Sequence, residues 1–265
     1  MLAVNWVRFP AGADARPPAP VWPLEGVLDG IAAAGFGAVG LDHYTLDAHG
    51  GTRDELARLL RERELRCTDV GIVALGELER AAVAALAETA APLGARLCIA
   101  SLYRPLPRDA IVRELRAAAA ALAPAGIRIA FEFTAYGNPT TLADAVVICD
   151  AVGWERCGLL VDAWHVFRGG ESLADVAALD GDRIALVHLD DGAASPHPDA
   201  LFEGRFRRLP PGSGAFDLAG LKDALAAADY AGPLGLEVLS EELRRLPPDE
   251  GARRLRDAAR AARLV

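Results

Sequence analysis

The sequence predicts one (β/α)₈ barrel that spans residues 1–265 as a single domain. Short apolar runs alternate with helical patterns along the whole chain, and no composition shift marks a domain boundary. Four of the runs also end in a carboxylate or a histidine, and α/β barrels keep their functional side chains at the carboxyl ends of their strands. A doubly wound open sheet is the alternative. The sequence disfavours it because no glycine-rich phosphate loop follows the first strand.

Each element is predicted from its local pattern. Strands are expected at short apolar runs, which are residues 2–7, 38–41, 65–72, 96–100, 128–133, 159–165, 184–191 and 233–239. Helices are expected at amphipathic stretches, which are residues 24–34, 52–63, 77–91, 108–123, 141–152, 172–179, 217–228 and 249–264. Thr52 followed by Glu55 has the pattern of a capping box. Residues 9–23 and 191–216 show neither pattern, so we expect long irregular loops there and treat both as candidate lids.

The composition disfavours several classes of function. The formal net charge of −9 disfavours a nucleic-acid partner, because binding a polyanion requires a basic surface. No apolar run approaches the roughly 18 residues of a membrane span. The N-terminal residues lack the basic and apolar regions of a signal peptide, so we expect a cytoplasmic protein. We expect a small-molecule partner, no nucleic acid and no membrane, with a homodimer as a candidate assembly.

Cysteine and lysine usage narrows the chemistry further. The four cysteines, Cys67, Cys98, Cys149 and Cys157, lie in or beside apolar stretches without a CxxC spacing, which predicts buried, reduced thiols. Lys222 is the only lysine and falls in a helical pattern. Schiff-base chemistry, which needs a lysine on a barrel strand, is therefore disfavoured.

Four apolar runs each present one metal-ligand side chain where the run meets a loop: Glu132, Asp162, His188 and Glu237. Taken singly, such a carboxylate is more often a helix cap or a surface charge, and such a histidine more often a core residue. Taken together, carboxylates that end adjacent parallel strands would repel one another unless a cation lay among them. We therefore predict one divalent ion. The oxygen-rich set suits manganese best, with magnesium, cobalt or zinc as alternatives.

The C-terminal half resembles the sugar phosphate isomerase/epimerase family, the xylose isomerase-like TIM barrels. The resemblance is carried by FEFTAYGN, GLLVDAWHVFRGG, RIALVHLDD, RRLPPGSGAFDLAGL and YAGPLGLEVLSEELRRLPPDEGARR. It covers residues 126–260 well and the first half only in its strand rhythm. The family includes ketose 3-epimerases, inosose isomerases and dehydratases, and 3-dehydroshikimate dehydratases.

The resemblance implies roles for individual residues. The family's metal quartet carries over to Glu132, Asp162, His188 and Glu237, and the two glutamates are also the acid and base. Substrate-binding roles carry over to the histidine of the D-x-x-H element, His165, and to an arginine before the PG-x-G turn. Arg208 is the candidate for the latter, with Arg205 and Arg207 as competitors.

The implied activity is that of an isomerase or epimerase acting on a polyhydroxy ketone, either a ketose or a cyclitol ketone. Its first step would remove a proton next to the carbonyl and form a metal-stabilised enediolate. A dehydratase of the inosose or 3-dehydroshikimate type is the alternative. The turn departs from the family's commoner PGEG, since it reads PPGSG here.

Two further classes share the barrel. Apurinic endonucleases add histidines for three metals, but the run LRCTDVGI has none, and His197 is not part of an Asp-x-His element. A DNA repair enzyme is therefore disfavoured, also by the acidic balance. A non-catalytic sugar-binding barrel is disfavoured because the ligand set is complete.

Overall fold

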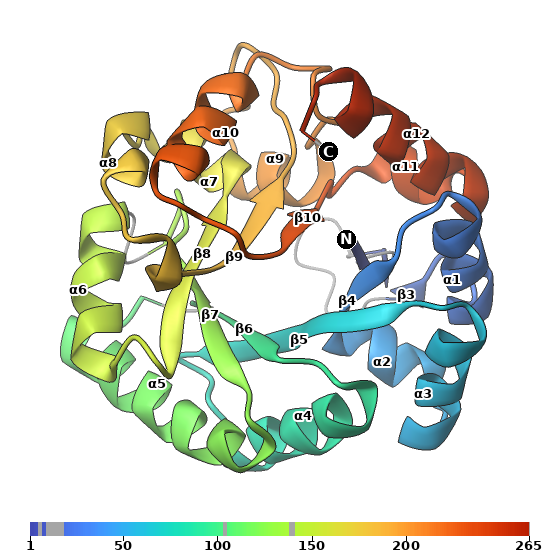
Figure 1. The fold of residues 1–265 in the computed structure, drawn as a ribbon, viewed down its shortest axis with the longest axis horizontal. Coiled ribbons are helices and arrows are strands. Elements are labelled where there is room, and N and C mark those ends of the chain that lie inside the picture. Colours follow the sequence, from blue (N-terminus) through green and yellow to red (C-terminus); the bar gives the residue numbers. More distant parts are fainter. Residues whose placement is uncertain (5–6, 9–18, 103–104, 138–140, 265) are drawn as a thin grey trace.

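The computed structural model describes the chain except residues 5–6, 9–18, 103–104, 138–140 and 265. In the described part, eight parallel strands close into a barrel in the order β1-β10-β9-β8-β7-β6-β5-β4 (Figure 1). Closure is complete because β1 pairs with both β4 and β10. The strands are β1 (Leu2–Val4), β4 (Ala38–Asp42), β5 (Arg66–Leu75), β6 (Leu97–Leu102), β7 (Arg128–Glu132), β8 (Cys157–Asp162), β9 (Ile184–Leu189) and β10 (Leu234–Leu236). The predicted barrel is confirmed and the open sheet is excluded.

Helices surround the barrel, as Figure 1 shows. The longer ones are α1 (Leu24–Ala33), α3 (Arg53–Glu62), α4 (Arg80–Leu93), α5 (Arg108–Leu122), α6 (Leu142–Val152), α10 (Leu218–Ala227) and α12 (Pro248–Ala261). The shorter ones are α2 (His43–His49), α7 (Ala163–Gly169), α8 (Leu173–Ala177), α9 (Ala200–Phe206) and α11 (Glu241–Arg245), with 3₁₀ turns at Ala123–Ala125 and Gly181–Arg183. The Thr52–Glu55 capping box is present at the start of α3. The assignment of residues 1–265 to a single domain stays a prediction.

Several predicted boundaries are wrong. Residues 191–216 are not wholly irregular, because α9 forms within them. Residues 159–165 are not all strand: β8 ends at Asp162, whose side chain caps the new helix α7. Neither α2 nor α11 was expected, since each is shorter than the window in which helical periodicity can be read. Of the expected loop 9–23, residues 9–18 lie outside the described part, and Ala19–Pro20 (β3) pairs antiparallel with Val7–Arg8 (β2).

Alternation along the strands decides which side chains face the barrel axis. An inner cluster is formed by buried residues of four neighbouring strands, namely Leu97, Ala130, Leu160, Ala185 and Leu186. Leu159 and Val161 belong instead to the larger core cluster. Because side chains alternate with a period of two, residues two positions beyond Ala130, Leu160 and Leu186 face inward again at the carboxyl ends of their strands. Those residues are Glu132, Asp162 and His188, so the candidate site lies one layer above the inner cluster.

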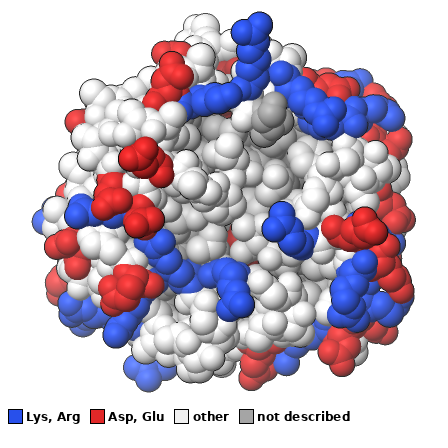
Figure 2. Space-filling model, in the orientation of Figure 1, with Lys and Arg blue, Asp and Glu red and all other residues white. Residues whose placement is uncertain are grey.

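The remaining expectations concern the thiols and the surface. All four cysteines are free and buried, as predicted. Within the described residues, no helix has the length and apolar character that crossing a membrane requires. On the face shown in Figure 2, side chains of both charges lie around the periphery, and the centre is largely uncharged.

Candidate metal centre at the carboxyl ends of the strands

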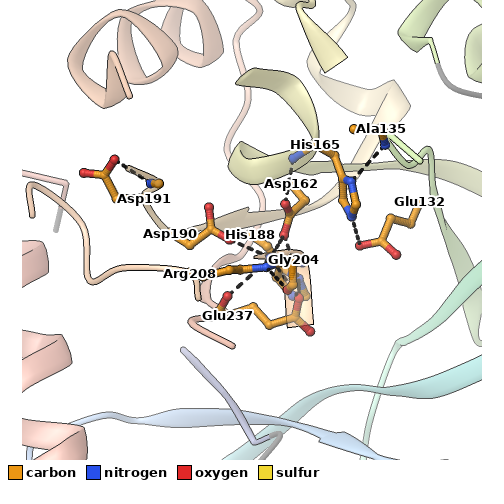
Figure 3. Close-up of polar contacts among 11 residues, drawn as sticks. Glu132, Ala135, Asp162, His165, His188, Asp190, Asp191, Gly204, Arg208 and Glu237 are labelled. Carbon is orange, nitrogen blue, oxygen red and sulfur yellow. Dashed lines mark hydrogen bonds and ion pairs between the residues drawn. The ribbon is translucent and has the colours of Figure 1, made fainter. Parts of the chain in front are cut away.

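Three of the four predicted ligands come together. One ligand atom each of Asp162, His188 and Glu237 lies within 4.8 Å of the others. The Nδ1 atom of His188 is 3.6 Å from Glu237 Oε2 and 4.0 Å from Asp162 Oδ2. Asp162 and His188 are directly paired across β8 and β9, while Glu237 follows β10 (Figure 3). The parallel register therefore places these three side chains at one end of the barrel.

The donor set fits a divalent cation. Both ring nitrogens of His188 are buried and find no hydrogen-bond partner among the described residues, although buried polar atoms are normally satisfied. Two carboxylates and an imidazole are hard and borderline ligands, which suit manganese, magnesium, cobalt or zinc. Ligand atoms about 2 Å from one cation lie roughly 3–4 Å apart, and the separations around Nδ1 are of this size.

Charges in the cluster shift the pKa values of its members. Burial opposes protonation of His188, but Glu237 and other carboxylates outweigh it and raise its pKa to about 9. The same ion pair outweighs burial at Glu237 and holds the pKa of that carboxyl below its usual range. A cation at this place would compete with the proton for the same imidazole nitrogen.

Glu132 lies apart from this group of three. It ends β7, and its Oε1 atom is 3.8 Å from Nε2 of His165. Burial raises its pKa to about 8, and Glu237 and Asp162 add to the shift. The carboxyl therefore faces the same acidic cluster without joining it (Figure 3). Its role as a fourth ligand stays a prediction.

His165 is fixed in one orientation. Its Nδ1 atom accepts a hydrogen bond of 3.1 Å from the backbone N–H of Ala135, and burial lowers its pKa to about 4. The imidazole is therefore neutral at pH 7 and carries its proton on Nε2, which is buried and makes no hydrogen bond in the described residues. Its backbone N–H donates to Asp162 Oδ1 at the start of α7. The Asp-x-x-His spacing thus gives both a helix cap and an oriented donor.

Of the three arginines before the PPGSG turn, Arg208 is the one in the site. Arg208 is buried, whereas Arg205 and Arg207 are exposed. Its Nη1 atom lies 2.7 Å from Asp162 Oδ2, 2.5 Å from Asp190 Oδ2 and 3.4 Å from Glu237 Oε2. Its Nε–H donates to the carbonyl oxygen of Gly204 at 2.8 Å. The guanidinium is therefore held on two sides.

Two residues of the site were missed in the sequence: Asp190 and Asp191, directly after β9. Asp191 accepts hydrogen bonds from four backbone N–H groups, those of Gly192, Gly212, Gly214 and Phe216. It also forms a two-way backbone bridge with Leu209. These contacts pin both ends of residues 192–216 to β9 and so place Arg208, the neighbour of Leu209. The sequence feature that could have identified them is the acidic pair at the end of VHLDD.

The expected lid 191–216 is tied to the barrel wall. Glu203 of α9 is buried and accepts from Nε of Arg168 at 3.0 Å and from the backbone N–H of His197 at 3.0 Å. Arg168 also lies over the Phe216 ring, 4.9 Å from its centroid. The described part of this segment is therefore anchored to α7 through Arg168.

Replacing Glu203 with glutamine should lower the free energy of unfolding by about 2–4 kcal/mol, because the partly buried charge of Arg168 would lose its buried counter-ion. Urea denaturation followed by circular dichroism measures the change. Asp109→Asn, which removes the fully exposed ion pair with Arg113, is the matched control and should change stability little. Equal effects of the two substitutions would contradict the anchoring role.

The geometry defines a closed (β/α)₈ barrel with a candidate divalent-metal site at the carboxyl ends of its strands. The family model described as xylose isomerase-like TIM barrel matches residues 28–262. The chain belongs to this family.

Curated relatives match part of the chain. It is 29% identical to the inosose isomerase of Halalkalibacterium halodurans over 136 residues, which are 51% of this chain and 47% of the relative. It is 30% identical to that of Bacillus licheniformis over 132 residues, 49% of this chain and 46% of the relative. The chain thus spans about half the length of the curated relatives it matches.

Solved structures share the fold. The IolI protein with a bound zinc atom has a TM-score of 0.83 and 19% identity, covering 91% of this chain and 93% of that chain. D-allulose 3-epimerase from Methylomonas sp. in complex with D-allulose has a TM-score of 0.71 and 20% identity, covering 91% and 94%. At these identities the likeness bears on the barrel alone.

Proposed function

We propose that the chain is a metal-dependent isomerase or epimerase that acts on a polyhydroxy ketone, either a ketose or a cyclitol ketone. The observation that carries the proposal is the meeting of Asp162, His188 and Glu237 within 4.8 Å at the mouth of the barrel. The match to inosose isomerases over half the chain supports the same class of substrate.

Asp162, His188 and Glu237 would hold one divalent cation, with Glu132 as a fourth ligand. When bound, the cation would supply Lewis acidity toward a ketone oxygen and an adjacent hydroxyl, which makes the intervening C–H more acidic. Manganese is the metal we expect, because oxygen ligands predominate. The zinc atom in the IolI structure supports a divalent ion.

Glu132 and Glu237 would move the protons. Glu132 ends β7 and Glu237 directly follows β10. Figure 3 shows their carboxyl groups apart, with Asp162 and Arg208 near Glu237. A substrate between them would meet one carboxyl as base and the other as acid. Removal and return of a proton on different faces gives epimerisation, and return to the neighbouring carbon gives isomerisation.

His165 and Arg208 would hold the substrate. The Nε2–H of His165 makes no hydrogen bond among the described residues. Because the imidazole is neutral, this N–H can donate to a substrate oxygen that gains negative charge. Its distance of 3.8 Å from Glu132 Oε1 places this donor beside the predicted acid or base. Arg208 offers a second donor group on the other side of Asp162.

Metal removal tests the proposal. Protein stripped with a chelator should lose deuterium incorporation next to the carbonyl of inososes and ketoses in D₂O, and added Mn²⁺ should restore it. Proton NMR of the substrates measures the exchange, and metal analysis measures the bound ion. Exchange that persists in metal-free protein would contradict the proposal. Loss of water from the substrate would identify the dehydratase alternative, which shares the first step. The cytoplasmic location and the homodimer stay predictions.

A further inference from the structure

Asp190 is a buried carboxylate that no predicted role uses. It follows β9 by one residue, and its side chain is fully inaccessible to solvent. Its Oδ2 atom is 2.5 Å from Nη1 of Arg208, and its Oδ1 atom is buried without a hydrogen-bond partner in the described residues. A buried carboxylate is normally retained only where it balances a charge. Here that charge is the guanidinium of Arg208.

Arg208 faces more negative charge than it carries. The carboxylates of Asp162, Asp190 and Glu237 all lie within 3.4 Å of its Nη1 atom. Burial and the neighbouring Asp162 raise the pKa of the Asp190 carboxyl, and Arg208 opposes this shift only in part. A divalent cation would offset the charges on Asp162 and Glu237. Asp190, 2.5 Å from Nη1, is then the carboxylate that balances Arg208.

The pair of Asp190 and Arg208 is also fixed in place. Arg208 is held through Nε by the Gly204 carbonyl, and its neighbour Leu209 is bridged to Asp191 through two backbone hydrogen bonds. Asp190 lies between the end of β9 and Asp191, whose side chain accepts the backbone N–H of Gly192. Both side chains are buried. These contacts hold Arg208 beside Asp190 and oppose its movement toward an anion brought by a ligand.

We infer that Asp190 neutralises Arg208 and thereby restricts the site to substrates that present an uncharged hydroxyl to this arginine. An unpaired buried arginine would bind a carboxylate or a phosphate with two parallel hydrogen bonds. With its charge balanced, Arg208 remains a hydrogen-bond donor, and a further anion would meet repulsion. The substrate class is therefore a neutral polyhydroxy ketone.

The inference rests on the proposed function and makes it narrower. Among the alternatives, an inosose is a neutral ring of hydroxyl groups with one ketone, while 3-dehydroshikimate carries a carboxylate on its ring. Asp190 favours binding of the inosose and disfavours binding of 3-dehydroshikimate. This preference is the same whether the reaction that follows proton removal is isomerisation, epimerisation or dehydration. Asp190 acts here through Arg208 and decides specificity, without taking part in the proton transfers.

Asp190→Asn tests this role, because asparagine keeps the shape and removes the charge. Calorimetric titration of Mn²⁺-loaded protein with an inosose and with 3-dehydroshikimate gives the ratio of the two dissociation constants. Wild-type protein should bind the inosose at least about 10-fold more tightly. Asp190→Asn should shift the ratio about 10-fold or more toward the carboxylate, the effect of exposing one buried charge. Asp190→Glu, which keeps the charge, should retain the wild-type preference.

Controls separate specificity from damage. Asp223→Asn, an exposed aspartate on α10, should leave the ratio unchanged. Metal content and deuterium exchange on the inosose show whether each variant retains a working site. If Asp190→Asn does not fold, Arg208→Gln replaces it. That variant should weaken both ligands by a similar factor, whereas an anion-binding arginine would lose the carboxylate selectively.

The outcomes distinguish the two proposals. A wild-type protein that exchanges the inosose yet binds 3-dehydroshikimate equally well would overturn the role of Asp190 and leave the proposed function intact. An unchanged ratio in a folded, metal-loaded Asp190→Asn variant would do the same. Absence of metal-dependent exchange on every ketone would overturn both.

Discussion

Replacing Glu237 with glutamine should lower the rate of deuterium exchange on an inosose or ketose by about 10³-fold, because a positioned acid or base contributes about 10²–10⁴-fold. The substitution removes the charge that faces Nδ1 of His188 at 3.6 Å and keeps the size of the side chain. The backbone carbonyl of residue 237, which faces Arg208, is unchanged. The rate is measured by NMR in D₂O at saturating Mn²⁺.

The matched control for this change is Glu242→Gln, whose side chain is 84% exposed on the following helix and which should retain full activity. Metal analysis of the Glu237→Gln protein then separates two causes. A variant that keeps its metal and loses exchange identifies proton transfer as the missing step. Full exchange activity in this variant would remove Glu237 from the mechanism.

Replacing Asp162 with asparagine should weaken the affinity for Mn²⁺ by at least about 100-fold, more than the 10–100-fold typical of a residue that only supports a ligand. The Oδ2 atom that faces His188 would become an amide nitrogen and would place a donor against Nη1 of Arg208. Calorimetric titration with Mn²⁺ measures the loss of affinity.

Folding should survive this substitution. The amide oxygen of asparagine can replace Oδ1, which caps α7 by accepting the backbone N–H of His165, and asparagine is a favourable N-cap residue. The metal-free Asp162→Asn protein should still fold, but it should unfold at a lower temperature than wild type and the exposed control Asp223→Asn, because an amide donor then faces Nη1 of Arg208. A variant that binds Mn²⁺ as tightly as wild type would show that Asp162 is not a ligand.

Much of the fold could be predicted because apolar runs mark buried parallel strands directly. The runs around Ala130, Leu160 and Leu186 also carried their site residues two positions further along, so alternation alone placed Glu132, Asp162 and His188 inside the barrel. Short helices were harder, because α9 has seven residues and its position depends on the tertiary contact between Glu203 and Arg168.

The candidate site was predictable where a pattern is local and less so where it depends on distant contacts. The Asp-x-x-His spacing and the strand-end carboxylates are visible in the sequence. The pairing of Asp190 with Arg208 joins residues 18 positions apart, and only the fold brings them together. Asp69 is another buried carboxylate whose surroundings the sequence does not reveal. It lies buried in β5, its Oδ1 atom has no hydrogen-bond partner in the described residues, and burial raises its pKa to about 6.

The hydrogen bonds that Asp191 accepts close residues 192–216 into a ring whose two ends meet at β9. Because the ring is closed at its base, the position of Arg208 there does not depend on the length of the ring. Within this architecture, the outer part of the ring can lengthen, shorten or change sequence while the guanidinium stays beside the strand ends. The shape of the substrate pocket can therefore diversify without disturbing the charges at its floor.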